Sequence, residues 1–439
     1  MDLRNDGVIN ILGVPFEASN QKGIDDLVGR GMFSFELFDP TVHGGFRIFK
    51  SRMVCEVKGK TMVPYKKSRL VVQGYNDEGK YEILTQSPTI QLSSQQLILA
   101  LAPALLKDKG MFVELHDITQ AYPQAQTELL RTILAHLPKE LTTKYPEGTI
   151  ICVIKLLYGI AEAGVHWFAT YQGHHCKELD MATSTYDPCL LITNGGSKAF
   201  GIVSLQTDNT LAIGTSAFLS AEEAALQKAD FRAKPKDRLS KEMPLEFNGC
   251  AKIEVIDKAA DRAQKYMEQP AQIQQPADKD YMKLNHRLKW QAENLERGLQ
   301  YVPLNLATAK LIVFTDSSFA NNQDLSLQLG YLIVLANKDT HRNPDSMFNI
   351  RGNMVYWSLT KCKQVTQSIL ASKTYGMVSG VNIAIAILTT LKMITERLGL
   401  PSILLIVCTD SYSLYECLVK LGTTNEKRLM IDIMALRQS

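Results

Sequence analysis

Short apolar segments that end on an acidic residue recur along this chain, and they limit the folds that it can adopt. Two of them, MFVELHDI (111–118) and GIVSLQTDNTLAIG (201–214), place Asp117 and Asp208 at the end or in the turn of an expected strand. Two more, LIVFTDSSF (311–319) and LLIVCTD (404–410), lie in the last third of the chain. Helical composition lies between them at 162–180, 219–242 and 369–397. The pattern therefore predicts mixed α/β domains with carboxylates at strand ends.

Length and composition set broader limits. The chain has 439 residues, of which 45% are apolar and 21% charged, with a net charge of +3. These values exclude a fully disordered chain and a histone-like tail, and the length predicts two or three domains. The eight cysteines form no CxxC or CxxH pair, which argues against a zinc knuckle or finger and suits reduced thiols.

The expected location is intracellular, either cytoplasmic or nuclear. The N-terminal residues MDLRNDGVIN contain no apolar signal segment. The longest apolar run, 377–394, contains five polar residues, so we expect a buried helix there and no membrane-spanning segment.

Further elements are expected along the chain. Strands are predicted at 46–59, 68–75, 151–159, 328–337 and 354–359, and helices at 93–106 and 284–299. A serine should cap the helix at 93–106, and Pro103 should bend or shorten it. Residues 257–280 are rich in Gln, Ala, Lys and Asp with two prolines, and we interpret them as a linker.

Asp117 and Asp208 are candidates for a metal site. They are 208 − 117 = 91 residues apart, and carboxylates held at fixed backbone points can share one or two Mg²⁺ ions. An aspartate at a strand end can also simply form a turn, and spacing alone leaves both alternatives open.

Positive charge is concentrated between Gly44 and Gly74, where eight Lys or Arg face a single acid, Glu56, for a net charge of +7. Clustered Lys and Arg displace counterions from a nucleic-acid backbone, although a solvated strand face has the same composition. A second basic run at 228–241 has a net charge of 6 − 2 = +4 and fits either a nucleic-acid-binding thumb or an exposed helix.

Six blocks of sequence follow one another over about 46–250: YKKSRLVVQGYNDEG (65–79), LTQSPTIQLSSQQLILALA (84–102), LHDITQAYPQAQTELLRTILAHLPKEL (115–141), IKLLYGIAEAGVHWFATY (154–171), STYDPCLL (184–191) and GIVSLQTDNTLAIGT (201–215). In content and order they resemble the reverse transcriptase of copia-type long-terminal-repeat retrotransposons, in its fungal form.

The last third, about 285–439, resembles the ribonuclease H of the same family. The blocks are VFTDSSFANNQDLSLQLGYLIVLA (313–336), VYWSLTKCKQVTQSILASKTYGM (355–377) and VCTDSYSLYECLVKLGTTNEKRLMIDIMALRQS (407–439). The expected fold is thus α/β (α+β), with right-hand polymerase palm and fingers followed by a ribonuclease H-like mixed sheet. The expected domains are an N-terminal remnant (1–45), the reverse transcriptase (46–250), a shortened thumb or connection linker (251–300) and a C-terminally truncated ribonuclease H-like domain (301–439).

The resemblance also implies roles for individual residues. Asp117 and Asp208 would bind Mg²⁺, or Mn²⁺ in its place, and Asp316 and Asp410 would be catalytic residues and metal ligands of the ribonuclease site. The residues that would contact the nucleotide or the template are Lys66, Lys67 and Arg69 at the phosphates, Tyr122 as a steric gate at the sugar, and Glu162 and Gln206. A packing role would explain an aromatic residue at Tyr122 equally well. An ordinary polar position on the surface would explain Glu162 and Gln206 equally well. The implied partners are a primer on an RNA or DNA template and deoxynucleoside triphosphates, without a membrane. The oligomeric state is not indicated.

Three departures from the family pattern predict impaired chemistry. Asn209 replaces the acid that pairs with Asp208, and Lys373 replaces a metal-binding Glu of the ribonuclease block. The stretch from Asp208 to Asp316 is short, 316 − 208 = 108 residues. We therefore expect a fragment of a larger polyprotein with a weakened or inactive polymerase and no ribonuclease activity. The alternative is a non-catalytic nucleic-acid-binding protein that uses the basic 44–74 surface.

Overall fold

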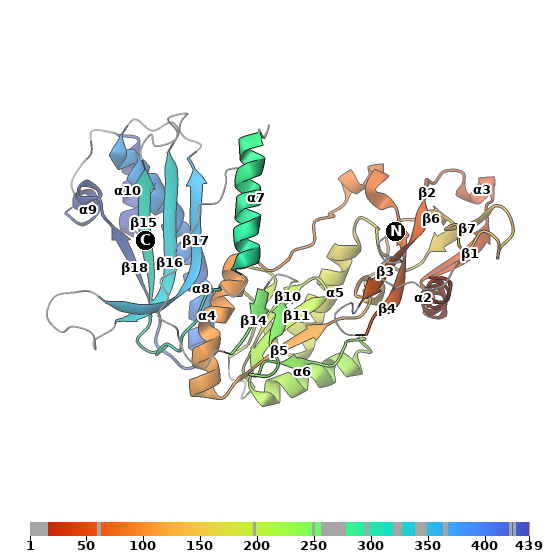
Figure 1. The fold of residues 1–439 in the computed structure, drawn as a ribbon, viewed down its shortest axis with the longest axis horizontal. Coiled ribbons are helices and arrows are strands. Elements are labelled where there is room, and N and C mark those ends of the chain that lie inside the picture. Colours follow the sequence, from red (N-terminus) through yellow and green to blue (C-terminus); the bar gives the residue numbers. More distant parts are fainter. Residues whose placement is uncertain are drawn as a thin grey trace. The chain divides into compact units, whose positions relative to one another are not determined.

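Two compact units make up the chain (Figure 1). The computed structural model describes residues 16–58, 63–195, 199–247, 251–255, 278–294, 298–318, 327–338, 349–362, 368–420, 424 and 427–438. The first unit comprises Met1–Ile90, Glu114–Asp237 and Phe247–Cys250, and the second comprises Gln91–Val113, Arg238–Glu246 and Ala251–Ser439. Both contain helices and sheets, which confirms the expected mixed α/β fold class.

A four-stranded sheet and a hairpin form one part of the first unit. The sheet has the order β1 (Phe33–Leu37), β7 (Thr149–Val153), β6 (Ile133–His136) and β2 (Ile48–Phe49), and the hairpin pairs β3 (Ser51–Lys58) with β4 (Tyr65–Val72). Helix α2 (Glu17–Gly29) packs on β4, and the short α3 (Pro40–His43) precedes β2. Alternate residues of β4, Ser68, Leu70 and Val72, are buried because they face a common apolar core.

A six-stranded sheet carries the two aspartates of the first unit. Its order is β12 (Asp237–Arg238), β5 (Phe112–Asp117), β11 (Asn209–Gly214), β10 (Gly201–Gln206), β9 (Leu190–Thr193) and β8 (Met181–Thr183). Helix α5 (Ala163–Glu178) packs on β8, and α6 (Ser216–Lys228) packs on β11. The remaining short elements are η1 (Gly74–Asn76), η2 (Glu78–Glu82), η3 (Tyr122–Gln124) and the pair β13 (Leu245–Phe247) and β14 (Ala251–Ile253).

The second unit is built on a mixed four-stranded sheet. Its order is β17 (Ile350–Lys361), β16 (Gln328–Lys338), β15 (Lys310–Ser318) and β18 (Leu404–Thr409), with only the β15–β18 pair parallel. Helix α8 (Ile369–Arg397) packs on β15 and β16, and α4 (Leu92–Lys109) packs on β17. The other helices of this unit are α7 (Asp278–Glu293), α9 (Tyr412–Val419) and α10 (Leu429–Gln438).

Helix α8 contains the longest apolar run of the sequence. By length and composition it is the one helix in the described part of the chain that could cross a membrane. It is also the helix that covers the sheet, with Met377, Val381, Ala384, Ile387 and Leu391 buried against the rest of the unit. This arrangement is that of the expected core helix.

Several local predictions were wrong. Helix α4 begins at Leu92 with Gln91 in the N-cap position, so the cap is not a serine, and the helix continues past Pro103 to Lys109. The helix predicted at 219–242 ends at Lys228, because the chain after a left-handed Asp230 (φ 57°) runs extended along β5. The strand predicted at 151–159 ends at Val153. The predicted linker at 257–280 lies outside the described residues except for its last three, which begin α7.

Candidate active site

Asp117 and Asp208 lie together at one end of the six-stranded sheet. Asp117 is the last residue of β5, and Asp208 lies in the turn between β10 and β11, which neighbours β5. The N–H of Ile118 donates a hydrogen bond to the carbonyl oxygen of Asp208 over 2.7 Å. Burial raises the pKa of Asp208, and the negative charge of Asp117 raises it further. The two carboxylates therefore lie within electrostatic reach of each other.

A buried tryptophan fixes the turn that carries Asp208. Thr207 has a left-handed backbone (φ 50°), and its carbonyl accepts a hydrogen bond of 2.7 Å from Nε1 of Trp167. Trp167 is 1% exposed and stacks on Tyr171 of the same helix. Because α5 anchors Thr207, the position of Asp208 follows from the packing of the helix on the sheet.

Asn209 and Gln206 face each other across this turn as a cross-strand pair. The amide Nδ2 of Asn209 lies 3.4 Å from Oδ1 of Asp208, so the residue contributes a donor where the family pattern has a charged acceptor. The Oε1 atom of Gln206 is buried and has no hydrogen-bond partner among the described residues. Both residues therefore lie beside Asp208, as their sequence positions require.

Strand β4 sends Lys67 and Arg69 to one face and Lys66 to the other. Burial lowers the pKa of Lys67, and the positive charges of Arg69 and Lys234 lower it further, so these three cations are close together. Arg69 pairs with Glu56 (3.0 Å) and lies over the Tyr158 ring.

Lys66 lies on the α2 side, with Nζ 5.9 Å from the centre of the Phe16 ring. Its backbone carbonyl accepts a hydrogen bond from the hydroxyl of Ser19. Since successive side chains of a strand point to opposite faces, the structure separates Lys66 from the expected phosphate contacts.

Tyr122 begins η3, five residues after Asp117, and its ring centre lies 5.2 Å from that of Tyr158. Burial raises the pKa of Tyr122, and the charge of Asp208 adds to the rise, which places the phenol near that carboxylate. Glu162 is different, because both of its carboxylate oxygens accept hydrogen bonds of 2.7 Å from Arg131, and it is 5% exposed. The side chain of Glu162 is therefore engaged in a buried ion pair.

Lys234 is the site residue that sequence reasoning missed. Its Nζ lies 2.5 Å from Oδ2 of Asp117, and its backbone N–H donates to the carbonyl of Asp117 over 2.9 Å. The N–H of Thr119 donates in turn to the carbonyl of Arg232, which completes a short antiparallel pairing. No local signal separates Lys234 from the other basic residues of 228–241, because the contact joins segments 117 residues apart.

A buried ionic cluster supports the strand and the segment that carry this pair. Glu222 of α6 is 1% exposed, and its Oε2 lies 2.7 Å from Nζ of Lys236. Its Oε1 lies 3.4 Å from Nδ1 of His116 and 3.6 Å from Nε2 of His175. Burial opposes the charged form of Glu222, but the adjacent rings of His116 and His175 hold its pKa well below the usual value. Lys236 also reaches Glu114 (3.4 Å), so one lysine joins β5, α6 and the segment after α6.

The donors at Asp117 and Asp208 fit a divalent cation only in part. Two carboxylates near each other are the hard oxygen ligands that Mg²⁺ and Mn²⁺ require. However, the ammonium of Lys234 occupies one oxygen of Asp117, and Asn209 adds no negative charge. The site therefore offers two charged ligands, one of which is already paired.

A second acidic pair lies in the second unit. Parallel pairing of Thr315 with Thr409 places Asp316, near the end of β15, beside Asp410, which directly follows β18. The ammonium of Lys373 lies between them, 2.6 Å from Oδ1 of Asp316 and 2.7 Å from Oδ1 of Asp410.

Helix α8 approaches β15 closely one turn after Lys373. At Gly376 a Cβ atom would lie only 2.1 Å from Oγ of Ser317. Lys373 places a positive charge between Asp316 and Asp410, where a metal ion would need negatively charged ligands. This cluster of two aspartates and a lysine therefore does not fit a divalent ion.

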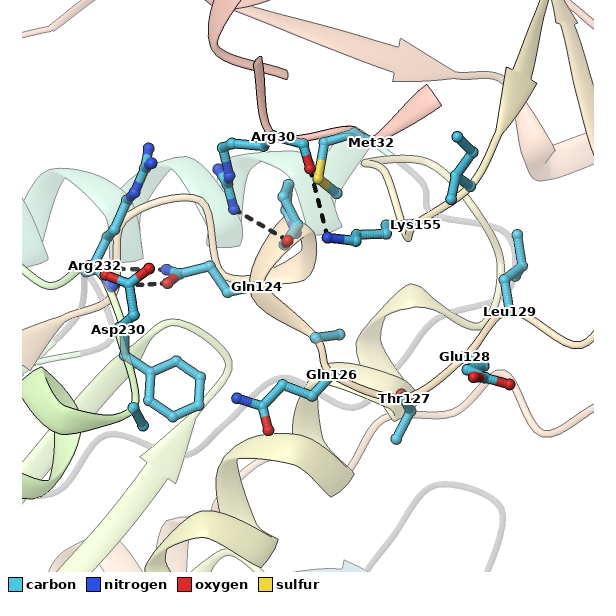
Figure 2. A pocket seen from close by; sticks show the side chains of 15 residues that line it. Arg30, Met32, Gln124, Gln126, Thr127, Glu128, Leu129, Lys155, Asp230 and Arg232 are labelled. Carbon is cyan, nitrogen blue, oxygen red and sulfur yellow. Dashed lines mark hydrogen bonds between the residues drawn. The ribbon is translucent and has the colours of Figure 1, made fainter. Parts of the chain in front are cut away.

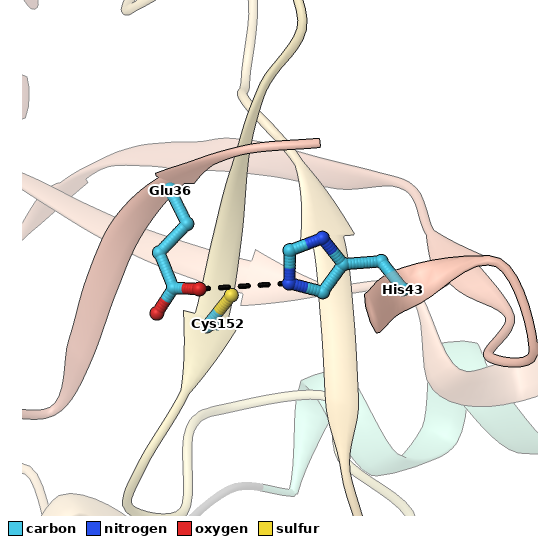
Figure 3. Close-up of side chains that lie close together, drawn as sticks. All are labelled: Glu36, His43 and Cys152. Carbon is cyan, nitrogen blue, oxygen red and sulfur yellow. Dashed lines mark ion pairs between the residues drawn. The ribbon is translucent and has the colours of Figure 1, made fainter. Parts of the chain in front are cut away.

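Glu36, His43 and Cys152 form another cluster of potential ligands (Figure 3). Their donor atoms all lie within 4.8 Å of one another. The backbone N–H of Asp39 donates to Nδ1 of His43 over 3.0 Å, so the ring proton belongs on Nε2, which faces Glu36. A protonated Nε2 has no free lone pair for a metal. Its contact in this structure is the carboxylate of Glu36, at 3.5 Å.

The first unit also contains an open pocket of about 760 Å³ (Figure 2), lined among others by Arg30, Lys155 and Arg232. Arg30 donates hydrogen bonds to Oε1 of Gln120 and to the carbonyl of Pro123, and Arg232 pairs with Asp26. The two arginines are thus engaged within the protein.

Comparison with solved structures shows limited likeness. The foamy viral protease–reverse transcriptase in complex with double-stranded DNA is similar with a TM-score of 0.46 and 12% identity, covering 96% of this chain and 80% of that chain. Telomerase from Candida albicans, in complex with a fragment of telomeric RNA, gives a TM-score of 0.31 and 6% identity, covering 54% of this chain and 48% of that chain. No curated protein matches the chain.

A family model identifies the chain more directly. The model described as reverse transcriptase (RNA-dependent DNA polymerase) matches residues 45–264, half of the chain, including both Asp117 and Asp208. The match confirms the copia-type resemblance seen in the motifs. The chain belongs to the reverse transcriptase (RNA-dependent DNA polymerase) family.

Proposed function

We propose that the chain is an RNA-directed DNA polymerase fragment of a copia-type retrotransposon whose nucleotidyl-transfer chemistry is impaired. One observation carries the proposal: the β5–β11 pairing brings Asp117 and Asp208, the two expected metal ligands of the polymerase motifs, to the same sheet end. The substrates would be a primer annealed to RNA or DNA and deoxynucleoside triphosphates. We also propose the boundaries 46–250 for the polymerase and 301–439 for the ribonuclease H-like part, and an intracellular location.

In this proposal the chain's own residues divide the work between cation and anion binding. Asp117 and Asp208 would hold Mg²⁺ or Mn²⁺, which supplies positive charge at the transferred phosphoryl group. Lys67 and Arg69 project from β4 near these carboxylates, since both lower the pKa of Asp208 against the effect of burial. They would neutralise the triphosphate, and Tyr122 would lie at the sugar. Gln206, beside the turn, would lie near the template, whereas the buried Glu162 would support the site through Arg131.

Asn209 is the residue that would limit the polymerase. A unit charge acting at about 4 Å contributes on the order of 4 kcal/mol at an effective dielectric constant of 20. Because about 1.4 kcal/mol corresponds to a factor of ten, the missing charge would reduce the rate roughly a thousandfold. In the second unit, Lys373 would abolish ribonuclease activity by pairing with Asp316 and Asp410.

Primer extension on a poly(rA) template tests the proposal. We expect the Asn209→Asp variant to extend the primer in Mg²⁺ or Mn²⁺ much faster than the unmodified chain. Asn194→Asp is a matched control, because Asn194 also donates to an aspartate (Asp180, 2.7 Å) but lies past the far end of β9. If neither the unmodified chain nor Asn209→Asp extends the primer, although both proteins melt cooperatively, that result would count against a usable polymerase site.

A second candidate function is nucleic-acid binding without catalysis. The observation that favours it is the exposure of Lys50, just before the β3–β4 hairpin, and of Arg52 in β3, both within the basic 44–74 surface. Binding of a primer–template duplex should weaken steeply as salt rises and should be unchanged by Asp117→Ala. Binding that is lost only when Mg²⁺ is withheld would contradict this candidate.

A further inference from the structure

Lys234 forms an ion pair with Asp117, a carboxylate that the proposed polymerase would use to bind its metal. The ammonium lies 2.5 Å from Oδ2 of Asp117, which is an ion pair on one of the two charged ligands of the site. A divalent cation that binds this oxygen must displace the ammonium or share the carboxylate with it. The repulsion between the two cations then opposes metal binding.

The backbone fixes Lys234 at this place. Two hydrogen bonds join 232–234 to 117–119: Thr119 N–H to the Arg232 carbonyl, and Lys234 N–H to the Asp117 carbonyl. Two residues further on, Lys236 is anchored in the protein by Glu222 and Glu114. The backbone of the segment is therefore held on both sides of Lys234, which keeps the exposed ammonium within reach of Asp117.

Other positively charged groups around the site also oppose the binding of a metal cation. Lys67 and Arg69 approach from β4, and Lys67 is close enough to Lys234 for the two charges to interact. Among the described residues, the acids that act on these cations are Asp117, Asp208 and Glu56. Glu56 is paired with Arg69, and position 209 is Asn. Two lysines thus balance two carboxylates before any metal binds.

We propose that Lys234 is the resident counterion of Asp117 and sets the divalent-metal affinity and selectivity of the site. This inference rests on the proposed function, since it assigns the metal site to Asp117 and Asp208. A cation must compete with a positioned ammonium for a carboxylate oxygen. Mg²⁺ loses its hydration water reluctantly, so the competition disfavours Mg²⁺ and the site prefers Mn²⁺.

Mn²⁺ binding to the full chain, measured by the loss of the free-ion electron paramagnetic resonance signal, tests this inference without primer or nucleotide. The variant is Lys234→Met, which removes the charge and keeps an apolar stem. An exposed lysine–carboxylate pair contributes about two- to fivefold to an equilibrium constant, so the variant should bind Mn²⁺ about two- to fivefold more tightly. Lys228→Met is the matched control, because Lys228 is an exposed lysine of α6 that pairs only loosely with Glu178 (3.7 Å). It should leave the affinity unchanged.

Asp117→Asn identifies the site, because it should remove the Mn²⁺ binding that Lys234→Met strengthens. Unchanged or weaker binding in Lys234→Met overturns the inference, as does tighter binding that persists in the Lys234→Met, Asp117→Asn double variant.

Primer extension separates this inference from the proposed function. Tighter Mn²⁺ binding without synthesis by any variant supports the counterion and overturns the polymerase. Synthesis without any change in Mn²⁺ affinity supports the polymerase and overturns the counterion.

Discussion

Replacing Lys373 should change how the second unit responds to divalent metal. Lys373 is 13% exposed at its side chain, while Asp316 and Asp410 are 80% and 66% exposed. In Lys373→Met the two carboxylates lose their shared cation but stay hydrated. In Lys373→Glu a third carboxylate takes the place of the ammonium, which creates a cluster of three oxygen ligands.

The magnitude follows from this exposure. Each ion pair to a largely exposed carboxylate contributes about 0.2–1 kcal/mol, so removing both costs about 1 kcal/mol. For a domain of this size that free energy lowers the melting temperature by about 2–4 °C. A metal at a hundredfold excess over its dissociation constant adds about 2.7 kcal/mol to stability, which is more than the substitution removes.

Differential scanning calorimetry of the full chain with and without Mn²⁺ is the assay. Mn²⁺ should leave the melting transition of the second unit unchanged in the unmodified chain and in Lys373→Met, whereas it should raise that transition by several degrees in Lys373→Glu. Lys392→Met is the control, since Lys392 also lies on α8 but makes only an exposed pair with Glu396 (3.8 Å). Mn²⁺-dependent stabilisation of the unmodified second unit, or none in Lys373→Glu, would refute this account of the site.

Three further predictions concern the first unit. Gly159→Ala should abolish soluble expression, because Gly159 has φ +86° and a Cβ would lie 1.9 Å from the carbonyl oxygen of Val72; a soluble, cooperatively melting variant would contradict this. Trp167→Phe removes the hydrogen bond to the Thr207 carbonyl and should lower the free energy of unfolding, measured with urea, by about 1–3 kcal/mol. An unchanged urea midpoint would show that other contacts hold the turn. Because the pKa of Glu222 is depressed in the folded state, its contribution to stability is present above about pH 4.5 and is lost as the pH falls through the folded value. Acid unfolding of Glu222→Gln should therefore depend less on pH than that of the unmodified chain.

The strands that carry the acidic residues could be predicted because their signal is local. Apolar runs that stop at Asp117 and Asp316 indicate strands with an acidic residue at or near the end: β5 ends at Asp117, and β15 continues two residues past Asp316 to Ser318. The segment 229–242 shows the limit of this approach. Its Ala, Lys and Arg favour a helix, but hydrogen bonds to Asp117 and Thr119 hold it extended, and composition does not contain that pairing.

The partners of the site residues were harder to predict than the residues themselves. Strand alternation in KKSR separates Lys66 from Lys67 and Arg69, so the sequence itself contains the information that Lys66 faces away from the phosphate contacts. By contrast, nothing near Glu162 reveals that Arg131 engages both of its oxygens. Ion pairs between distant segments depend on the finished fold, whereas a carboxylate at a strand end depends only on the strand.

The two acidic sites have the same kind of internal cation, and the difference between them predicts which chemistry can be recovered. Lys373 contacts both carboxylates of its pair, so no charged ligand there is without a lysine. Among the described residues Lys234 forms an ion pair with Asp117 alone, and Asp208 keeps a raised pKa with no ammonium hydrogen-bonded to it. A single charge change at position 209 adds a ligand beside an aspartate that is still available. At the second pair the lysine itself must be removed before any metal can bind. The polymerase site should therefore respond to one substitution that leaves its lysine in place, and the second site should respond only to a substitution of the lysine.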